Sequence, residues 1–141
     1  MTRISEFNAT THAGEALHVV SMENHDADSA FALAFVADEL PRVVHWGRPL
    51  TQPRTLVSAV DALRPQRVSG ALDETTWPSV LPTQAEAWTG EPRFVVRRDG
   101  VELFCRFVVT DIAVGDAGVA VTASDAEQGV EIIWTCEMRD S

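Results

Sequence analysis

The sequence predicts an all-β fold, an antiparallel β-sandwich with one short helix near residues 54–64. Apolar and polar residues alternate with a period of two over most of the chain, as they do along half-buried strands. Turn-forming stretches separate these runs at short intervals, and a helical spacing of apolar residues appears in one place. These observations favour about seven or eight strands packed as two layers.

The first predicted strands form a hairpin. Residues 17–22 alternate, residues 23–29 are polar and turn-forming, and residues 30–37 make a second apolar run. This pattern is typical of two antiparallel strands joined by a loop of several residues. A third strand is expected at 42–46, closed by a Gly-Arg-Pro sequence.

The spacing of apolar residues changes from that of a strand to that of a helix between Pro53 and Pro65. Leu56, Val60 and Leu63 recur at the spacing of one helix face. Proline suits the first turn of a helix and keeps the residue before it out of the helical region. The helix should therefore lie between the two prolines, with these three side chains on one of its faces.

A long loop is expected at residues 66–90, where Pro, Thr, Ser and Trp are frequent and periodicity is weak. Segments of this length are usually functional or disordered, and Trp77 and Trp88 favour order because each offers a large area to bury. Two interpretations of these tryptophans stay open. They plug the end of the sandwich, or their rings stack on the face of a sugar.

Strands resume after the loop. The run 94–98, an Asp-Gly turn at 99–100 and the run 101–111 predict a hairpin, because Asp-Gly between two such runs is a strong turn signal. One face of its second strand carries Leu103, Cys105, Phe107 and Val109. The other face carries Phe104, Arg106, Val108 and Thr110.

The last strands are expected at 119–124 and 130–139. One face of the final strand carries Ile132, Trp134, Cys136 and Met138. That strand runs almost to Ser141 with no later strand to pair with it, and an unpaired edge is a liability unless something covers it. We therefore expect a fragment of a longer protein, or an edge that is paired within an oligomer.

Two strand tryptophans are expected in the core. Trp134 lies in a clean alternation. We interpret Trp46 as a core residue with His45 at the sheet edge, and a functional role for this pair is the alternative.

Composition excludes several classes of function. At 141 residues, with 45% apolar and 23% charged residues, the chain has the make-up of one ordinary globular domain. Its formal net charge of -10 repels phosphate backbones and anionic lipid, which argues against nucleic-acid and membrane partners but suits a neutral sugar. There is no apolar run near the ~20 residues of a membrane span, and no visible signal peptide. We expect a cytoplasmic protein.

The residues alone nominate no catalytic site. Cys105 and Cys136 fall inside strand-like runs, so we expect two thiols rather than a disulfide. The histidines share no ligand spacing with them, and no metal or cofactor is expected. No serine elbow and no glycine-rich phosphate loop is present. Asp73 and Glu86 make an imaginable carboxylate pair, but solvated surface charge is the better interpretation.

Several short motifs follow one another between residues 40 and 112. They are Val-Val-His-Trp-Gly-Arg-Pro-Leu at 43–50, Leu-Asp at 72–73, Val-Leu-Pro-Thr-Gln at 80–84, Trp-Thr-Gly-Glu-Pro at 88–92, Arg-Asp-Gly at 98–100 and Arg-Phe-Val-Val-Thr-Asp at 106–111. In this order the stretch resembles the N-terminal domain of glycoside hydrolase family 36 α-galactosidases, particularly an actinobacterial-like branch.

The resemblance implies a supersandwich-like domain that precedes a (β/α)8 barrel. In the family the barrel carries an Asp nucleophile and an Asp acid/base and removes terminal α-linked galactose with retention. This chain is too short for a barrel, so residues 1–141 are expected to be a single non-catalytic domain of a longer glycosidase. Its implied partners are galactosides bound by the parent enzyme, the barrel and neighbouring subunits.

The resemblance also gives the long loop a role. In some tetrameric members a loop of this domain helps to shape a neighbouring subunit's active site, which implies that Asp73, Trp77 and Trp88 are adjacent to substrate. The chain departs from those members because it lacks their acidic-aromatic run after Leu-Pro; residues 83–88 stand there instead. The alternatives are a stand-alone carbohydrate-binding module, with both tryptophans as its platform, and a protein-interaction sandwich.

Overall fold

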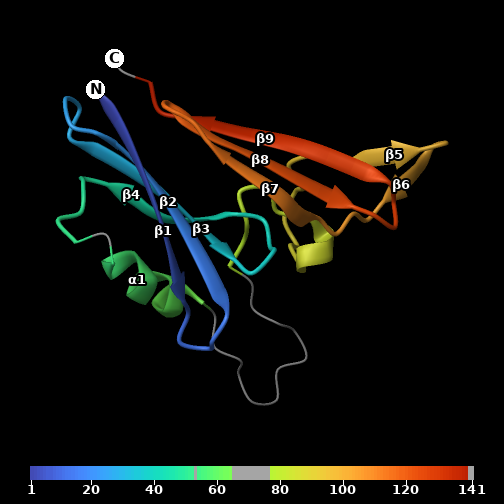
Figure 1. Cartoon of the computed structure of the whole chain (residues 1–141). Helices are drawn as coiled ribbons and strands as arrows, with labels where there is room; N and C mark the ends of the chain where they lie inside the picture. Colours follow the sequence, from blue (N-terminus) through green and yellow to red (C-terminus); the bar gives the residue numbers. More distant parts are fainter. Residues whose placement is uncertain (53, 65–76, 140–141) are drawn as a thin grey trace.

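The computed structural model describes residues 1–52, 54–64 and 77–139 (Figure 1). In these residues nine strands form three antiparallel sheets, accompanied by one α-helix and one short 3-10 helix. This arrangement confirms the predicted all-β sandwich. None of the helices in the described part of the chain is long and apolar enough to cross a bilayer.

The first sheet has four strands in the order β1 (Thr2–Thr10), β2 (Ala16–Asn24), β3 (Ser29–Val36) and β4 (Arg42–Gly47). The predicted hairpin is β2 and β3, and β4 is the predicted third strand. Strand β1 was not predicted. Its apolar residues do not form one stripe, because Ile4 packs on one face of the sheet while Phe7 and Ala9 pack on the other.

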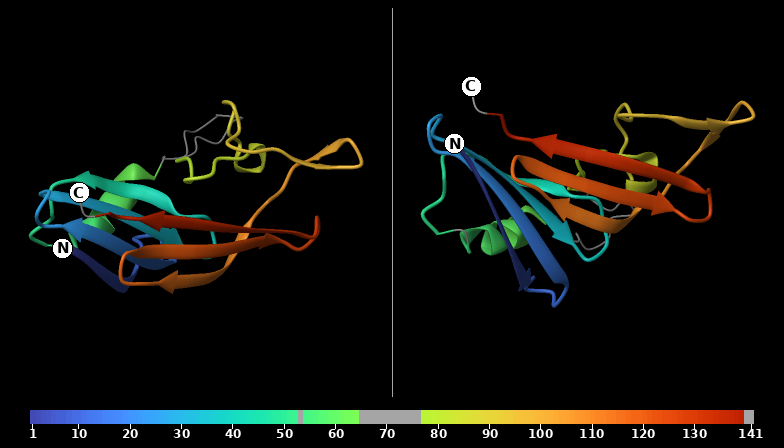
Figure 2. Two further views of the ribbon diagram at one scale, coloured as in Figure 1. Left: turned by 90° about the horizontal axis from the view of Figure 1, so that it is seen from above. Right: turned by 45° about the horizontal axis from the view of Figure 1, so that its top comes forward.

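Both faces of this sheet are covered (Figures 1 and 2). On one face, which we call the helix side, Leu56 and Val60 of helix α1 (Thr55–Leu63) pack in a buried cluster with residues of β2, β3 and β4. On the other face, Leu33 and Phe35 of β3 pack with Val121 of the second sheet. Burial on both faces explains why β3 reads as an almost continuous apolar run.

The second sheet has three strands in the order β7 (Val108–Val114), β8 (Gly118–Asp125) and β9 (Val130–Glu137). The predicted apolar face of the last strand is confirmed, because Ile132, Trp134, Cys136 and Met138 all pack against buried clusters. Among the described residues β9 pairs only with β8 and is therefore an edge.

The strand predicted at 101–111 is interrupted, which corrects that prediction. Strand β5 (Val96–Arg98) pairs with β6 (Val101–Leu103), and β7 starts only at Val108. The chain changes sheets in between, where the Arg106 amide donates to the Asp125 carboxylate at 2.8 Å instead of to a strand partner. The predicted faces persist, since Cys105 and Phe107 are buried while Phe104 and Arg106 are exposed.

Asp125 also organises the turn into β9. Its second carboxylate oxygen accepts from the Gln128 amide at 2.9 Å. The hydrogen bonds from the Gln128 and Arg106 amides hold the pKa of this carboxyl below its usual value. The Asp-Gly turn of the β5–β6 hairpin is confirmed, with φ of 51° at Asp99 and 81° at Gly100.

Trp46 is not a core residue, which corrects the prediction. Its side chain is 82% exposed and meets Phe31 edge to face, with ring centroids 5.7 Å apart. The reason is a bulge in the β3–β4 ladder, where Leu33 pairs with Val43 and Ala32 with His45. The extra residue, Val44, takes the helix side and turns Trp46 to the opposite face, at the edge of the sheet.

The helix prediction is right in position, and two of the three apolar residues on the predicted face are buried. Leu56 is 2% exposed and Val60 is fully buried, but Leu63 is 45% exposed. The helix ends at Arg64, whose ψ of 125° is extended, as expected of a residue that precedes proline. Pro53 and Pro65 lie outside the described residues.

These two leucines give a matched test of the core. Leu56→Ala should lower the free energy of unfolding by about 2–4 kcal/mol, because it leaves a cavity between the helix and the sheet. Leu63→Ala changes the same residue type in the same helix and should cost less than about 1 kcal/mol. Urea denaturation followed by circular dichroism measures both. Equal losses would contradict the packing of α1 described above.

Candidate functional site

The predicted loop at 66–90 is described from Trp77 onward, and Asp73 lies outside the described residues. We call residues 77–92 the tryptophan segment. Its regular part is the 3-10 helix η1 (Gln84–Glu86), and the segment leads into the β5–β6 hairpin. Its two tryptophans are held in different ways at its two ends.

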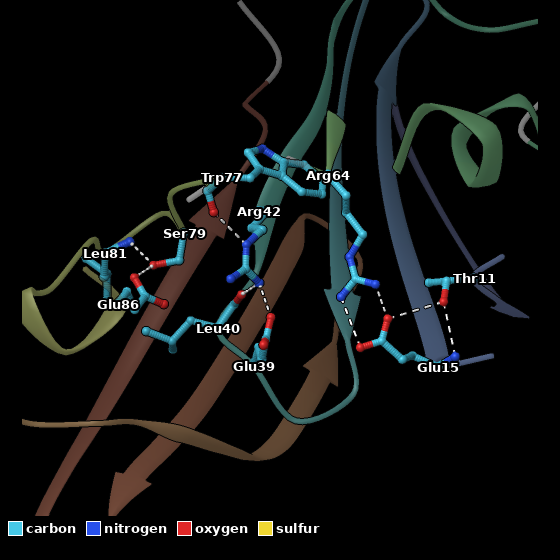
Figure 3. A network of polar contacts seen from close by, with 10 residues as sticks. All are labelled: Thr11, Glu15, Glu39, Leu40, Arg42, Arg64, Trp77, Ser79, Leu81 and Glu86. Carbon is cyan, nitrogen blue, oxygen red and sulfur yellow. Dashed lines mark hydrogen bonds and ion pairs between the residues drawn. The ribbon is translucent and has the colours of Figure 1, made fainter. Parts of the chain in front are cut away.

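Arg42 holds the start of the segment against the first sheet (Figure 3). Its Nε donates to the Trp77 carbonyl oxygen at 2.8 Å, and its guanidinium carbon lies 5.8 Å from the centroid of the Trp77 ring. The same guanidinium donates to Glu39 at 2.6 Å. Three contacts from one largely buried arginine fix both the backbone and the indole of Trp77.

The Trp77 indole is also part of the packing. It is partly buried against the helix-side cluster, which includes Leu17, Val19 and Leu56. A second backbone link follows, because the Val80 amide donates to the Pro41 carbonyl oxygen at 2.9 Å. The segment therefore begins as a cover over one end of the sandwich core.

Ser79 ties the start of the segment to η1. Its hydroxyl donates to the Glu86 carboxylate at 2.8 Å and accepts from the Leu81 amide at 3.3 Å. Ser79 is buried, so these hydrogen bonds satisfy a polar group that has left water. Glu86 therefore helps to hold the segment in place. Asp73, its partner in the carboxylate pair considered from the sequence, lies outside the described residues.

Trp88 is folded back onto its own turn. Its indole Nε1 donates to the Glu91 carbonyl oxygen at 3.1 Å. A Cβ at Gly90 would lie 2.6 Å from Cζ2 of the Trp88 ring, so only glycine allows this approach. The Trp-x-Gly spacing therefore has a direct structural reason. Trp88 is partly exposed and belongs to none of the apolar clusters among the described residues.

A second arginine fixes the end of α1. Arg64 makes a two-pronged ion pair with Glu15 in the β1–β2 loop, one prong being Nη2 to Oε1 at 3.0 Å (Figure 3). The hydrogen bond from Arg64 lowers the pKa of Glu15 and raises that of Arg64. Thr11 contributes a weaker hydroxyl contact to Glu15 at 3.4 Å. Together Arg64 and Arg42 secure the chain on both sides of residues 65–76.

The end of the segment borders a shallow depression. Its lining residues come from the segment and from the β5–β6 hairpin: Thr83, Gln84, Pro92, Phe94, Val95, Val96, Glu102, Leu103, Phe104 and Cys105. Glu102 is the one carboxylate in this lining, and neither Trp77 nor Trp88 reaches it. Within the described ranges no cluster of His, Cys, Asp and Glu is placed to hold a metal.

Both cysteines are free thiols in the structure. Cys105 packs beside Phe107, and Cys136 packs in the cluster between the two large sheets. Burial raises the pKa of both thiols, which disfavours the reactive thiolate.

Sequence reasoning found the tryptophans but missed the residues that hold them. Arg42 carried a weak signal, since an arginine opens an otherwise apolar strand directly after a proline. Ser79 carried none, because its buried hydrogen bonds depend on the fold of the segment. Trp77 and Trp88 lie toward the two ends of the tryptophan segment. Asp73 is the one residue predicted for the site that lies outside the described residues.

One comparison with known proteins gave a match. A family model described as the glycosyl hydrolase family 36 N-terminal domain matches residues 39–141. The matched region runs from the residues just before β4 to the end of the chain and includes the whole tryptophan segment. No curated protein and no solved structure matches this chain.

Replacing Gly90 tests the Trp88 arrangement. Gly90→Ala should push the indole away from the turn, because the new methyl group meets the ring at 2.6 Å, and should cost about 1 kcal/mol. Tryptophan fluorescence should shift accordingly. Gly115→Ala is the control, since a Cβ there has its nearest neighbour at 3.8 Å. If Gly90→Ala still shifts the fluorescence of a protein that also carries Trp88→Leu, another tryptophan causes the shift and this assignment is contradicted.

The Glu15–Arg64 pair predicts a pH dependence. A carboxyl whose pKa is lowered by folding stabilises the protein above its unfolded-state pKa of about 4.3, and this contribution is lost as the pH falls through the lowered value. Because the pair is partly exposed, Glu15→Gln should cost less than about 1 kcal/mol at pH 7 and nothing at low pH. Thermal unfolding of wild type and Glu15→Gln at a series of pH values measures this loss of stability, and Glu131→Gln at an exposed residue is the control. A stability difference between wild type and Glu15→Gln that is the same at all pH values would contradict the prediction.

Proposed function

The chain belongs to the family of glycosyl hydrolase family 36 N-terminal domains, and we propose from this membership that it is the non-catalytic N-terminal domain of a cytoplasmic, retaining α-galactosidase. The observation that carries the proposal is the match over residues 39–141, which spans β4 to β9. In this proposal the two carboxyl roles of the hydrolysis lie on a (β/α)8 barrel of the parent enzyme. We assign no catalytic residue and no cofactor to this chain.

The domain would have three tasks in the parent enzyme. It supports the barrel, takes part in oligomer assembly and frames an active site with residues 66–90. Asp73, Trp77 and Trp88 are the residues we propose to be adjacent to substrate. Two features of the described part support a framing role, namely the Arg42 contacts that fix Trp77 and the glycine turn that fixes Trp88. Side chains that are held before substrate arrives lose less entropy when they bind it.

The two tryptophans differ in what they can offer to a sugar. Trp77 already packs against the helix-side cluster and under Arg42, so much of its surface is in use. Trp88 is partly exposed, and its ring is held in place by its own turn. We therefore propose Trp88 as the principal stacking residue and Trp77 as the cover that fixes the base of the segment.

The gene itself offers the most direct test of the domain assignment. We expect the reading frame to continue past residue 141 into a barrel-coding region. A stop codon at that point would overturn the proposal and favour a stand-alone module.

The isolated chain should not hydrolyse an aryl α-galactoside, because the reaction needs both carboxyl roles in one site. Titration calorimetry with millimolar galactosides should likewise show no binding to it. Turnover would contradict the non-catalytic assignment. Measurable binding would instead support the alternative of a carbohydrate-binding module with Trp77 and Trp88 as its platform.

In the parent enzyme, Trp88→Ala should lower kcat/KM for an aryl α-galactoside about tenfold, the loss expected when one stacking contact is removed. Trp88→Phe should recover part of the loss. Trp46→Ala is the matched control, since it removes another exposed tryptophan from the edge of β4 and should leave kcat/KM unchanged. Wild-type kcat/KM in Trp88→Ala would remove Trp88 from the site and leave the domain assignment standing.

A further inference from the structure

The connector between β3 and β4 joins the first sheet to the second. We call residues 37–41 the β3–β4 connector, and its main chain continues into a strand of the first sheet at either end. The Val109 amide of β7 donates to the Asp38 carbonyl oxygen at 2.7 Å. Leu40 is buried and packs in a cluster with Ala123 of β8. The connector is therefore held by both sheets.

The same connector holds the start of the tryptophan segment. Pro41, a buried residue at its end, accepts the hydrogen bond from the Val80 amide at 2.9 Å. Arg42 follows directly as the first residue of β4, and its main chain pairs with Ala34 in the β3–β4 ladder. The backbone of Arg42 is thus fixed by the sheet at the point where the segment is attached.

Two residues of the connector orient the Arg42 side chain (Figure 3). Its Nη1 donates to the Glu39 carboxylate at 2.6 Å and lies 3.4 Å from the Leu40 carbonyl oxygen, which also accepts from it. The side chain is only 14% exposed, so little of it is free to move into water. Because the guanidinium is planar and rigid, these contacts also set the direction of its Nε–H, which donates to the Trp77 carbonyl oxygen.

Trp77 lies outside the strands and helices, so its position depends on two kinds of support. Its ring packs against the helix-side cluster, and the guanidinium carbon of Arg42 lies 5.8 Å from the ring centroid. Apolar packing is non-directional, whereas a hydrogen bond from a charged donor has a preferred distance and angle. The cluster therefore accounts for the burial of the indole, and Arg42 accounts for its orientation.

We infer that Arg42 is a positioning residue of the active site framed by the tryptophan segment, and that it acts through the Trp77 indole without touching substrate itself. The inference rests on the proposed function, in which Trp77 is adjacent to substrate. The contacts run from the connector through the guanidinium to the indole, so the ring is held relative to both sheets. An arginine with a purely structural role would stabilise the fold and leave substrate binding unchanged.

Arg42→Lys in the parent enzyme tests this role. Lysine keeps a positive charge near Glu39 but lacks the planar fork that bonds the Trp77 carbonyl oxygen and lies over the ring. KM for an aryl α-galactoside should rise about fivefold with kcat nearly unchanged, because a displaced framing side chain weakens ground-state and transition-state binding alike. Arg98→Lys is the matched control. Arg98 also donates to a main-chain carbonyl oxygen, but from the β5–β6 hairpin, so KM should stay at the wild-type value.

A double-mutant cycle separates action through the indole from a general effect on the fold. Trp77→Ala removes the ring and keeps the main-chain carbonyl oxygen that Arg42 bonds. When residue 77 is already changed in this way, Arg42→Lys should alter KM by less than about twofold. If the full rise in KM persists in that background, Arg42 does not act through the indole and the inference is overturned.

Glu39→Gln supplies a second variant in case Arg42→Lys does not fold. Glu39 is half exposed, so its replacement leaves the core intact and only loosens the guanidinium. KM should rise about two- to threefold, and this rise should also disappear in the Trp77→Ala background. Circular dichroism and thermal unfolding establish that each variant is folded before its kinetics are measured.

Wild-type KM in both Arg42→Lys and Glu39→Gln would overturn the inference, as would a fall in kcat with KM unchanged. Either result leaves the proposed function standing, because the parent enzyme still hydrolyses the galactoside. A wild-type parent that does not hydrolyse an α-galactoside would instead overturn the proposed function, and this inference with it.

Discussion

The rest of the structure depends on the burial of the β2–β3 hairpin on both faces. Helix α1 covers one face and the second sheet covers the other, and neither cover packs on the other without the hairpin between them. The residues of β3 suit this position. Its alanines at 32 and 34 face the helix, while Leu33 and Phe35 face the second sheet. Small side chains allow the helix backbone to approach, and large ones fill the wider space between sheets.

A second constraint acts where regular structure stops. The tryptophan segment has few ladder hydrogen bonds of its own, so its conformation depends on contacts with residues distant in sequence. Arg42 supplies the main one, because a planar guanidinium can donate to a carbonyl oxygen, pair with a carboxylate and lie over an indole together. Lysine offers neither the planar fork nor the same stacking. The base of this irregular segment is thus fixed by side-chain contacts rather than by a strand ladder.

Much of the fold could be predicted because its determinants are local. The period-two runs gave the β2–β3 hairpin, β4, β8 and β9, and the spacing of Leu56 and Val60 gave the helix. The errors arise where tertiary contacts override the local pattern. A bulge at Val44 turns Trp46 outward, and the chain leaves one sheet for another at residues 104–107. The candidate site was less predictable, since Trp77 is fixed by an arginine 35 residues earlier, and no local pattern records such a pair.

The position of the β2–β3 hairpin has a consequence for how the protein acquires its fold. The family match begins at residue 39, but β1, β2 and β3 precede that residue, and β2 and β3 form the centre of the sandwich. A piece cut at the family boundary would lose the surface on which α1 and the second sheet pack. During synthesis, by contrast, the order in which the strands occur along the chain favours folding. Strands β1 to β3 are consecutive antiparallel neighbours, so their contacts close short loops and can form early. Within this chain, β2 and β3 therefore leave the ribosome before helix α1 and the second sheet that pack on them.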